Sequence, residues 1–254
     1  MKRRELGFVA VDRTHVGCVR KLNEDRVLSR TSLGLWAVAD GMGGHQRGDL
    51  ASSMIVDALV AIDPMDSGFA FLDNVQDVIQ RVNRTLVAHA RLSAPGTVIG
   101  STVVVLLAFG GHYACLWAGD SRGYLLRGGR LEQITRDHSM VQEMIDSGAL
   151  NRADAPAFGR SNVITRAVGV QDSLALDLHS GPIEGDDIFL LCSDGLTGMI
   201  DDHGIADILT TSQSLDGAAD RLLDQALAHG GKDNVSFVLI RADAAQDDTL
   251  QRLR

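Results

Sequence analysis

Short apolar runs, rich in valine and leucine and bounded by glycine or aspartate, recur along much of the chain. Runs of this kind predict β-strands. The predicted strands cover residues 33–39, 101–110, 112–119, 187–193 and 235–242, and residues 121–135 predict two further strands around a Gly128-Gly129 turn. Glycine favours a hairpin at that turn because it adopts the backbone conformations that tight turns need.

Apolar residues at helical spacing occur between these strands. The spacing predicts helices over residues 48–62, 71–92, 139–146 and 215–229. One face of the first helix would carry Leu50, Met54, Ala58 and Ile62, and one face of the second Phe71, Val75, Val78, Ile79, Val82 and Leu86. Since the strands come in neighbouring pairs and do not alternate strictly with helices, the pattern favours antiparallel sheets with helices packed outside them.

Length and composition are those of an ordinary globular protein. The chain has 254 residues, of which 45% are hydrophobic and 22% charged. No linker, low-complexity tract or repeat divides it, so we expect a single domain over residues 1–254. The N-terminus lacks the apolar segment of a signal peptide, and no apolar run approaches the roughly 18 residues of a membrane span. We therefore expect no membrane association.

Charge and cysteine usage narrow the class of partner and the compartment. The net charge of −9 disfavours nucleic acid as the main partner, because binding to phosphate backbones needs basic patches. Cys18, Cys115 and Cys192 are widely spaced and odd in number, which argues against a disulfide framework or a zinc site. A reducing cytoplasm is the expected location. An acidic excess has one further use, which is to hold cations.

Four aspartates lie at the ends of predicted strands. Asp40, Asp120 and Asp194 each follow an apolar run, and Asp233 comes just before one. Aspartate is common in turns, so each alone is compatible with a structural role. Carboxylates on rigid strand ends can instead converge, and an all-oxygen cluster selects Mg²⁺ or Mn²⁺ over zinc. Gly41 after Asp40 would leave a backbone carbonyl accessible as another ligand.

Seven motifs follow one another in order along the chain. They are VGCVRKLNEDRV (16–27), VADGMGGHQRGDLAS (38–52), STVVVLLA (101–108), WAGDSRGYLLRGGRLEQITRDHSMVQEMIDSGAL (117–150), NVITRAVG (162–169), FLLCSDGLTGMI (189–200) and GGKDNVSFVLI (230–240). Together they resemble a bacterial member of the PPM, or type 2C, family of metal-dependent serine/threonine protein phosphatases. The resemblance covers about residues 7–242 and leaves a short C-terminal tail, 243–254.

The resemblance implies an α+β fold, in which two packed antiparallel β-sheets are flanked by α-helices on both outer faces. It implies that Asp40 bridges two metal ions, Mn²⁺ or Mg²⁺, with the Gly41 carbonyl on one of them. Asp194 and Asp233 would complete the other site, and Asp120 would support a third, weaker ion.

Three further residues take roles from the same resemblance. Glu24 and Asp25, in the NED motif, would hold a metal or its waters. Arg20 would bind the substrate phosphate. A water shared by the two ions would be deprotonated near neutral pH and attack phosphorus directly. Arg20 and the metals would offset the charge that develops on the phosphoryl oxygens.

No protein nucleophile is then needed. Ser193 has no G-x-S-x-G elbow around it and is interpreted as a strand residue, and the neighbouring Cys192 as a core residue. For His138 we expect a structural hydrogen bond. For His45, structural and functional roles are equally open.

The chain departs from the family pattern at three places. Met42 stands where many eukaryotic relatives carry a histidine that is proposed to protonate the leaving group, and methionine cannot do so. Gly198 stands where family members often have a second acid near Asp194. The polar segment 151–160 occupies the variable flap of the family, where a substrate-contacting role and a plain surface loop both remain open.

The leading hypothesis is an active, monomeric phosphatase that acts on phosphoserine and phosphothreonine in proteins and opposes a Hanks-type kinase. A pseudophosphatase that binds phosphoproteins without hydrolysis is a second hypothesis. The presence of Asp40, Asp194, Asp233 and Arg20 argues against it. A third hypothesis is a two-metal hydrolase of small phosphomonoesters, which turnover on phosphopeptides and metabolite phosphates would distinguish.

Overall fold

The computed structural model describes residues 6–43, 47–94, 96–151, 154 and 163–243. The elements in order are β1 (Gly7–His15), β2 (Asp25–Arg30), η1 (Thr31–Leu33), β3 (Leu35–Met42), α1 (Arg47–Val60), α2 (Gly68–Arg91), β4 (Gly100–Ser101), β5 (Val103–Phe109), β6 (His112–Ala118), β7 (Arg122–Arg127), β8 (Arg130–Gln133), α3 (Met140–Asp146), β9 (Asp177–Pro182), β10 (Ile188–Cys192), α4 (Asp194–Thr197), α5 (Asp202–Thr211), α6 (Leu215–Ala228) and β11 (Val235–Asp243).

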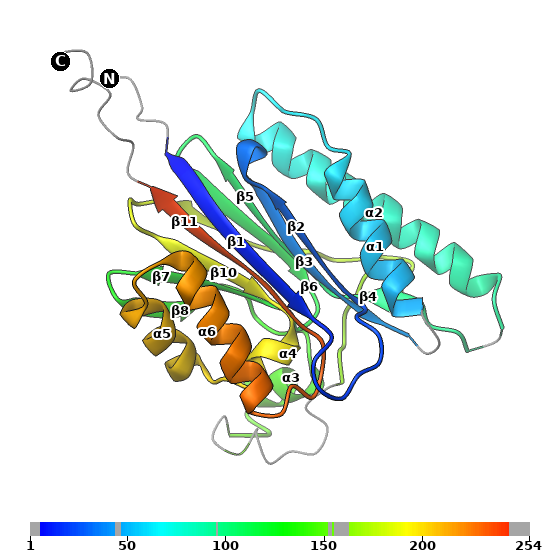
Figure 1. The fold of residues 1–254 in the computed structure, drawn as a ribbon. Helices are drawn as coiled ribbons and strands as arrows, with labels where there is room; N and C mark the ends of the chain where they lie inside the picture. The colour runs from blue at the N-terminus through cyan, green and yellow to red at the C-terminus, as the bar shows by residue number, and fades with distance from the viewer. Residues whose placement is uncertain (1–5, 44–46, 95, 152–153, 155–162, 244–254) are drawn as a thin grey trace, which may run out of the picture.

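The strands form two antiparallel sheets (Figure 1). One has the order β1-β11-β10-β7-β8, and the other has the order β2-β3-β5-β6-β9, with β4 paired to β3. Helices α1 and α2 cover the outer face of the second sheet, and α4 to α6 cover the outer face of the first (Figure 1). The predicted fold, two packed antiparallel sheets with helices on both outer faces, is confirmed.

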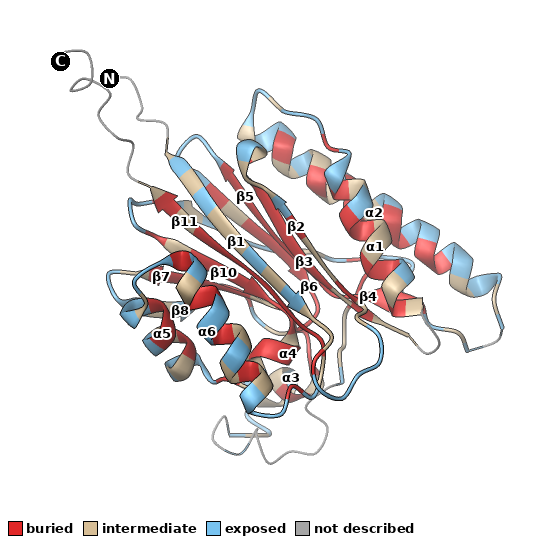
Figure 2. Cartoon of the chain, in the orientation of Figure 1, coloured by how far each residue is buried: buried red, intermediate tan, exposed pale blue. Residues whose placement is uncertain are grey.

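The central strands are buried along most of their length (Figure 2), and the core forms three layers. In β3, Trp36 and Val38 face the other sheet, where Phe189 and Val238 belong to the same buried cluster. Leu35, Ala37 and Ala39, on the opposite face of β3, join the cluster under α1 and α2. Successive side chains of a strand point to opposite faces, and both faces here are covered, so β3 is an uninterrupted apolar run.

Two details of the predicted elements are wrong. The strand predicted to end before Asp40 continues to Met42, because β4 pairs with Gly41 and Met42 and extends the ladder. In the first helix, the buried stripe is Ala51, Ile55 and Leu59. The predicted face is offset from it by one residue, and its first member, Leu50, is exposed. The second helix buries all six predicted residues.

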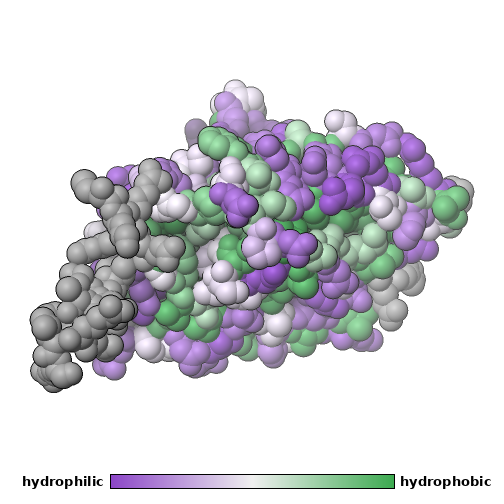
Figure 3. Space-filling view, turned by 90° about the horizontal axis from the view of Figure 1, so that it is seen from above, coloured by the Kyte–Doolittle hydropathy of each residue, from purple (hydrophilic) through white to green (hydrophobic). Residues whose placement is uncertain are grey.

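The remaining surface is largely polar, with scattered apolar residues. Seen from above in Figure 3, hydrophobic residues emerge between hydrophilic ones, as is usual for globular proteins. Within the described part of the chain, no helix combines the length and the apolar character that a membrane span requires. His45 and most of the 151–160 segment lie outside the described residues, so their roles stay predictions.

Candidate metal centre

Five aspartates gather at one end of the two sheets. Asp40 lies near the end of β3, Asp120 follows β6, and Asp194 begins α4, two residues after the end of β10. Asp233 precedes β11, and Asp25, the first residue of β2, is paired with Asp40 in the strand register. The negative charges of the other four all act on the Asp40 carboxyl group. The structure therefore places these acids at one end of the sheets, within range of one another's charge.

The backbone of Asp40 is fixed by the residues that lead into β5. Its N–H donates to the Thr102 hydroxyl at 3.1 Å, and its carbonyl oxygen accepts the Thr102 N–H at 2.8 Å. The Ser101 hydroxyl donates to the same carbonyl at 2.9 Å. These bonds fix the backbone that carries the Asp40 side chain, at the end of the sheet where the other acids lie.

Burial and repulsion between carboxylates shift Asp40, Asp120 and Asp194 toward their neutral forms. Burial first, and then the charges of Asp25 and Asp194, hold the pKa of Asp40 well above its usual range. Burial raises the pKa of Asp120 to about 7, with Asp194 as the next cause. Burial also raises the pKa of Asp194, helped by the charge of Asp233. A cation placed among these carboxylates would remove the repulsion.

Burial likewise raises the pKa of Asp25 to about 6, although hydrogen bonds from Ser193 and Ser236 oppose the shift. The Ser193 hydroxyl donates to Asp25 Oδ2 at 2.8 Å. Ser193 itself is fully buried and lies at the N-cap position of α4, just after the strand to which the sequence assigned it. The serine is thus a partner of an acid in the cluster.

Two acceptor atoms in this region are shielded from solvent and have no donor. They are Asp120 Oδ1 and Glu24 Oε1. An unpaired buried acceptor is costly in a folded protein, and a bound cation is one way to satisfy it. The donor set is all oxygen, which fits Mg²⁺ or Mn²⁺. On these observations, the residues present fit a divalent metal centre.

The side chains are not all in ligating positions as they stand. Among the described residues, no three histidine, cysteine or acidic side chains converge in a way that could hold an ion. Asp233 Oδ2 is instead paired with Arg20, whose Nη2 donates to it at 2.6 Å. Metal binding would have to compete with this ion pair.

Glycine at position 41 is required by close packing. A Cβ atom there would lie 2.2 Å from the Gly48 carbonyl oxygen and 2.6 Å from that of Glu24. The bare backbone lets the start of α1 and the Glu24 segment approach the end of β3. This is a reason for Gly41 that the sequence did not reveal, beside its predicted role as a carbonyl ligand.

The remaining candidate residues have structural partners. His138 Nδ1 accepts the N–H of Gly119 at 3.1 Å, next to Asp120, so the expected structural hydrogen bond is confirmed. Cys192 is fully buried in the core, as predicted. Gly198 contributes no acid beside Asp194. The sequence did not reveal Ser193 as a hydrogen-bond partner of Asp25. It also did not reveal Asn234, whose buried side chain bonds to the backbone of Val16, Leu22 and Glu24.

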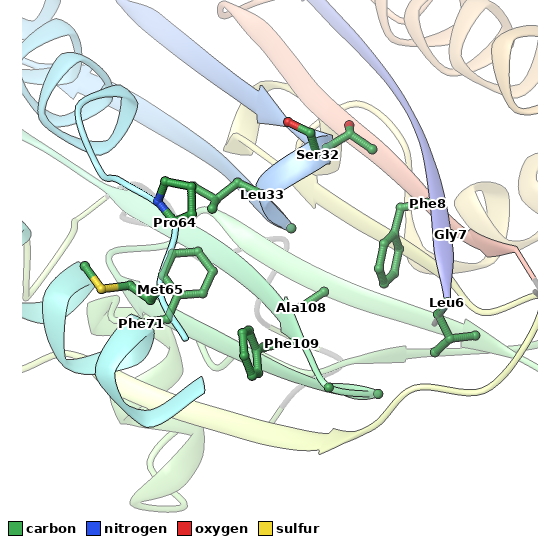
Figure 4. Close-up of a pocket in the computed structure, with 14 residues that line it drawn as sticks. Leu6, Gly7, Phe8, Ser32, Leu33, Pro64, Met65, Phe71, Ala108 and Phe109 are labelled. Atoms are coloured by element: carbon green, nitrogen blue, oxygen red, sulfur yellow. The ribbon is translucent and has the colours of Figure 1, made fainter. Parts of the chain in front are cut away.

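A cavity of about 700 Å³ opens at the other end of the strands (Figure 4). Its walls include Leu6, Phe8, Leu33, Met65 and Phe109. It contains none of the predicted site residues, and apolar side chains dominate it. The cavity is therefore separate from the predicted site.

The chain is similar in sequence to known protein phosphatases. The model of the protein phosphatase 2C family matches residues 10–144. The serine/threonine phosphatase stp of Listeria welshimeri is 34% identical over 241 residues, covering 92% of this chain and 96% of the relative.

Solved structures of related proteins are similar to this chain over nearly its full length. PppA, a key regulatory component of the T6SS in Pseudomonas aeruginosa, has a TM-score of 0.86 and 42% identity, over 93% of this chain and 98% of that one. The catalytic domain of the serine/threonine protein phosphatase PstP, in complex with 2 manganese ions, has a TM-score of 0.84 and 33% identity, over 94% and 100% of the two chains.

Proposed function

The chain belongs to the protein phosphatase 2C family and is a serine/threonine phosphatase, and we propose that it removes phosphate from phosphoserine and phosphothreonine residues of proteins with the help of two divalent metal ions. The observation that carries the proposal is the acidic cluster, where burial and neighbouring carboxylates raise the pKa of Asp25, Asp40, Asp120 and Asp194 and two buried acceptor atoms lack donors. Such a set of oxygens is suited to hard divalent cations.

We assign the ligands from the resemblance to the family. Asp40, the Gly41 carbonyl, Asp194 and Asp233 would hold the two core ions, Mn²⁺ or Mg²⁺. Asp120 would support a third, weaker ion, and Glu24 and Asp25 would hold an ion or its waters. When bound, the ions would supply a water of lowered pKa as the nucleophile and would offset negative charge on the phosphoryl group.

Arg20 would bind the substrate phosphate. Its guanidinium already faces the cluster, where it pairs with Asp233. The negative charges of Asp194 and Asp40 also stabilise its protonated form. Its side chain is 55% exposed, so an incoming phosphate can reach it. A guanidinium grips two phosphate oxygens at once, which favours charge-assisted hydrogen bonds of defined geometry.

The other nucleophilic side chains near the site are unsuited to attack. Ser193 is buried and bonded to Asp25. Burial raises the pKa of the Cys192 thiol to about 12, so this thiol stays protonated and within the core at neutral pH. A water nucleophile is therefore the simplest mechanism. We further propose that residues 7–242 form a single catalytic domain that acts as a cytoplasmic monomer on the products of a Hanks-type serine/threonine kinase.

The test is hydrolysis by the purified protein after metal removal and restoration. We expect turnover of a phosphothreonine peptide only when Mn²⁺ or Mg²⁺ is returned. Peptide turnover should exceed that of metabolite phosphates at equal concentration. Equal or faster turnover of the metabolites would favour a small-molecule phosphatase, and no turnover with any metal would favour a binding protein.

A further inference from the structure

A buried asparagine joins the two segments that meet at the acidic end of the sheets. Asn234 follows Asp233 directly and is 6% exposed. Its backbone N–H donates to Asp233 Oδ1 at 2.9 Å, while Arg20 donates to the other oxygen, Oδ2, at 2.6 Å. Arg20 comes from the segment 16–24, named here the Arg20 loop, which lies with the start of β11 at the lower end of the sheets (Figure 1).

The side chain of Asn234 holds the Arg20 loop on both sides of Arg20. Its Nδ2 donates to the carbonyl oxygens of Val16, at 3.0 Å, and Leu22, at 2.8 Å. Its Oδ1 accepts the N–H of Glu24 at 2.8 Å. One amide group therefore makes three hydrogen bonds to the loop, and two of them flank Arg20 in sequence.

The middle of the loop has few other anchors. Val19 and Leu22 are exposed, so apolar packing does not hold it. The start of the loop packs on the Asp233 backbone through Gly17, where φ is +81° and a Cβ atom would lie 2.2 Å from the Asp233 carbonyl oxygen. Beyond that point, the Cys18 N–H donates to the Gly231 carbonyl oxygen at 2.7 Å, and Asn23 Nδ2 donates to the Thr14 hydroxyl at 2.8 Å. Between these two bonds, the stretch that carries Arg20 is held by the Asn234 bond to Leu22 and by the Arg20–Asp233 ion pair.

We propose that Asn234 is a positioning residue that holds Arg20 in the place where it binds the substrate phosphate. This inference rests on the proposed function, in which Arg20 is the phosphate-binding residue. A held guanidinium binds more tightly than a free one, because the ordering of the loop is complete before substrate arrives. Asn234→Ala would release the loop. It would keep the backbone N–H that bonds to Asp233, so this ligand of the core ions would stay in place.

The chain supplies a matched control. Asn83 is also a buried asparagine with three hydrogen bonds to backbone groups. Its Nδ2 donates to the carbonyl oxygens of Gln171 and Asp172, and its Oδ1 accepts the N–H of Gly169. It holds a segment that carries none of the proposed site residues. Asn83→Ala should therefore destabilise the fold in a similar way without acting on Arg20.

The first experiment measures steady-state kinetics on a phosphothreonine peptide at saturating Mn²⁺, inhibition by inorganic phosphate, and Mn²⁺ binding by calorimetry. Asn234→Ala should raise both KM and the phosphate inhibition constant about tenfold, with a smaller change in kcat and two ions still bound. Asn83→Ala should leave KM and phosphate inhibition at wild-type values. Equal changes in the two variants would overturn the proposal, because a general loss of structure would then explain both.

The second experiment is a double-mutant cycle with Arg20→Ala. If Asn234 acts through Arg20, the Arg20→Ala change should weaken phosphate binding about tenfold in the wild type and less than about twofold in the Asn234→Ala background. Additive effects would overturn the proposal. Should Asn234→Ala fail to fold, Asn234→Asp has the same size and keeps the acceptor for Glu24 N–H while losing both donated bonds. It should raise KM in the same direction, and a wild-type KM would contradict the inference.

These outcomes separate this inference from the proposed function. If the wild type hydrolyses the peptide and Arg20→Ala weakens phosphate binding while Asn234→Ala does not, only the positioning role of Asn234 fails. If the wild type shows no metal-dependent turnover, the proposed function fails first.

Discussion

Substitution of Ser193 by alanine should lower stability yet preserve most of the chemistry. The Ser193 hydroxyl is fully buried, donates to Asp25 Oδ2 at 2.8 Å and accepts the Ser236 N–H at 3.1 Å. Removal of a hydrogen bond to a charged, buried partner costs about 2 kcal/mol. For a chain of this length, that loss corresponds to a fall in the unfolding midpoint of about 4–8 °C.

The kinetics of Ser193→Ala distinguish a serine that only bonds to Asp25 from a serine that attacks the substrate. Because the hydroxyl points to Asp25, Ser193→Ala should reduce kcat on a phosphothreonine peptide by less than about tenfold. Loss of a true nucleophile would reduce it by about 10⁵-fold or more. Thermal unfolding by circular dichroism and steady-state kinetics on the same sample give both quantities.

A matched variant controls for the loss of a serine as such. Ser214 caps α6, where its hydroxyl accepts the Gly217 N–H at 3.0 Å, away from the acidic cluster. Ser214→Ala should cost about 1 kcal/mol and leave kcat unchanged. A folded Ser193→Ala protein without turnover would refute the assignment of a water nucleophile.

Three further predictions follow from the same site. Arg20→Ala should raise KM for phosphopeptide about tenfold, whereas Lys21→Ala, at an exposed neighbour, should leave KM unchanged. The reverse pattern in a kinetic assay would show that Arg20 does not bind the phosphate. Asp120→Ala should abolish the binding of a weak third Mn²⁺ in a calorimetric titration and lower turnover, while two tighter ions still bind. An unchanged titration would leave Asp120 only a structural role in its turn. Because burial raises the pKa of Asp120 to about 7, the folded metal-free protein binds more protons than the unfolded chain between about pH 4 and 7. Its stability should therefore fall as pH rises through this range and level off above it. A melting temperature in chelator that does not fall from pH 5 to 7 would argue against the buried cluster.

The central strands were predictable because they are buried on both faces. One face of β3 and β5 packs against helices, and the opposite face packs against the first sheet, so each strand is an unbroken apolar run. Edge strands carry a weaker signal. β1 and β9 lie at the edges of their sheets and are largely exposed or half-buried, and they form because β11 and β6 provide a ladder to pair with. Neither was predicted.

The candidate site was predictable to the level of its carboxylates but not of their supports. Asp40, Asp120, Asp194 and Asp233 follow or precede apolar runs, so their clustering could be anticipated. The contacts of Asn234 could not, because it binds carbonyl groups more than 200 residues away in sequence, with separations of 218 and 212 positions. No local pattern encodes such a contact.

The central claim is that the acidic cluster is a metal centre on which phosphoprotein hydrolysis depends. The most direct test counts Mn²⁺ ions by calorimetry and follows phosphothreonine-peptide turnover in the same titration, for the wild type and for Asp40→Asn. We predict two tightly bound ions in the wild type, turnover that rises with their occupancy, and a loss of about 10³-fold or more in kcat for Asp40→Asn. Full turnover by the metal-stripped wild type, or near-normal turnover by Asp40→Asn, would contradict the account.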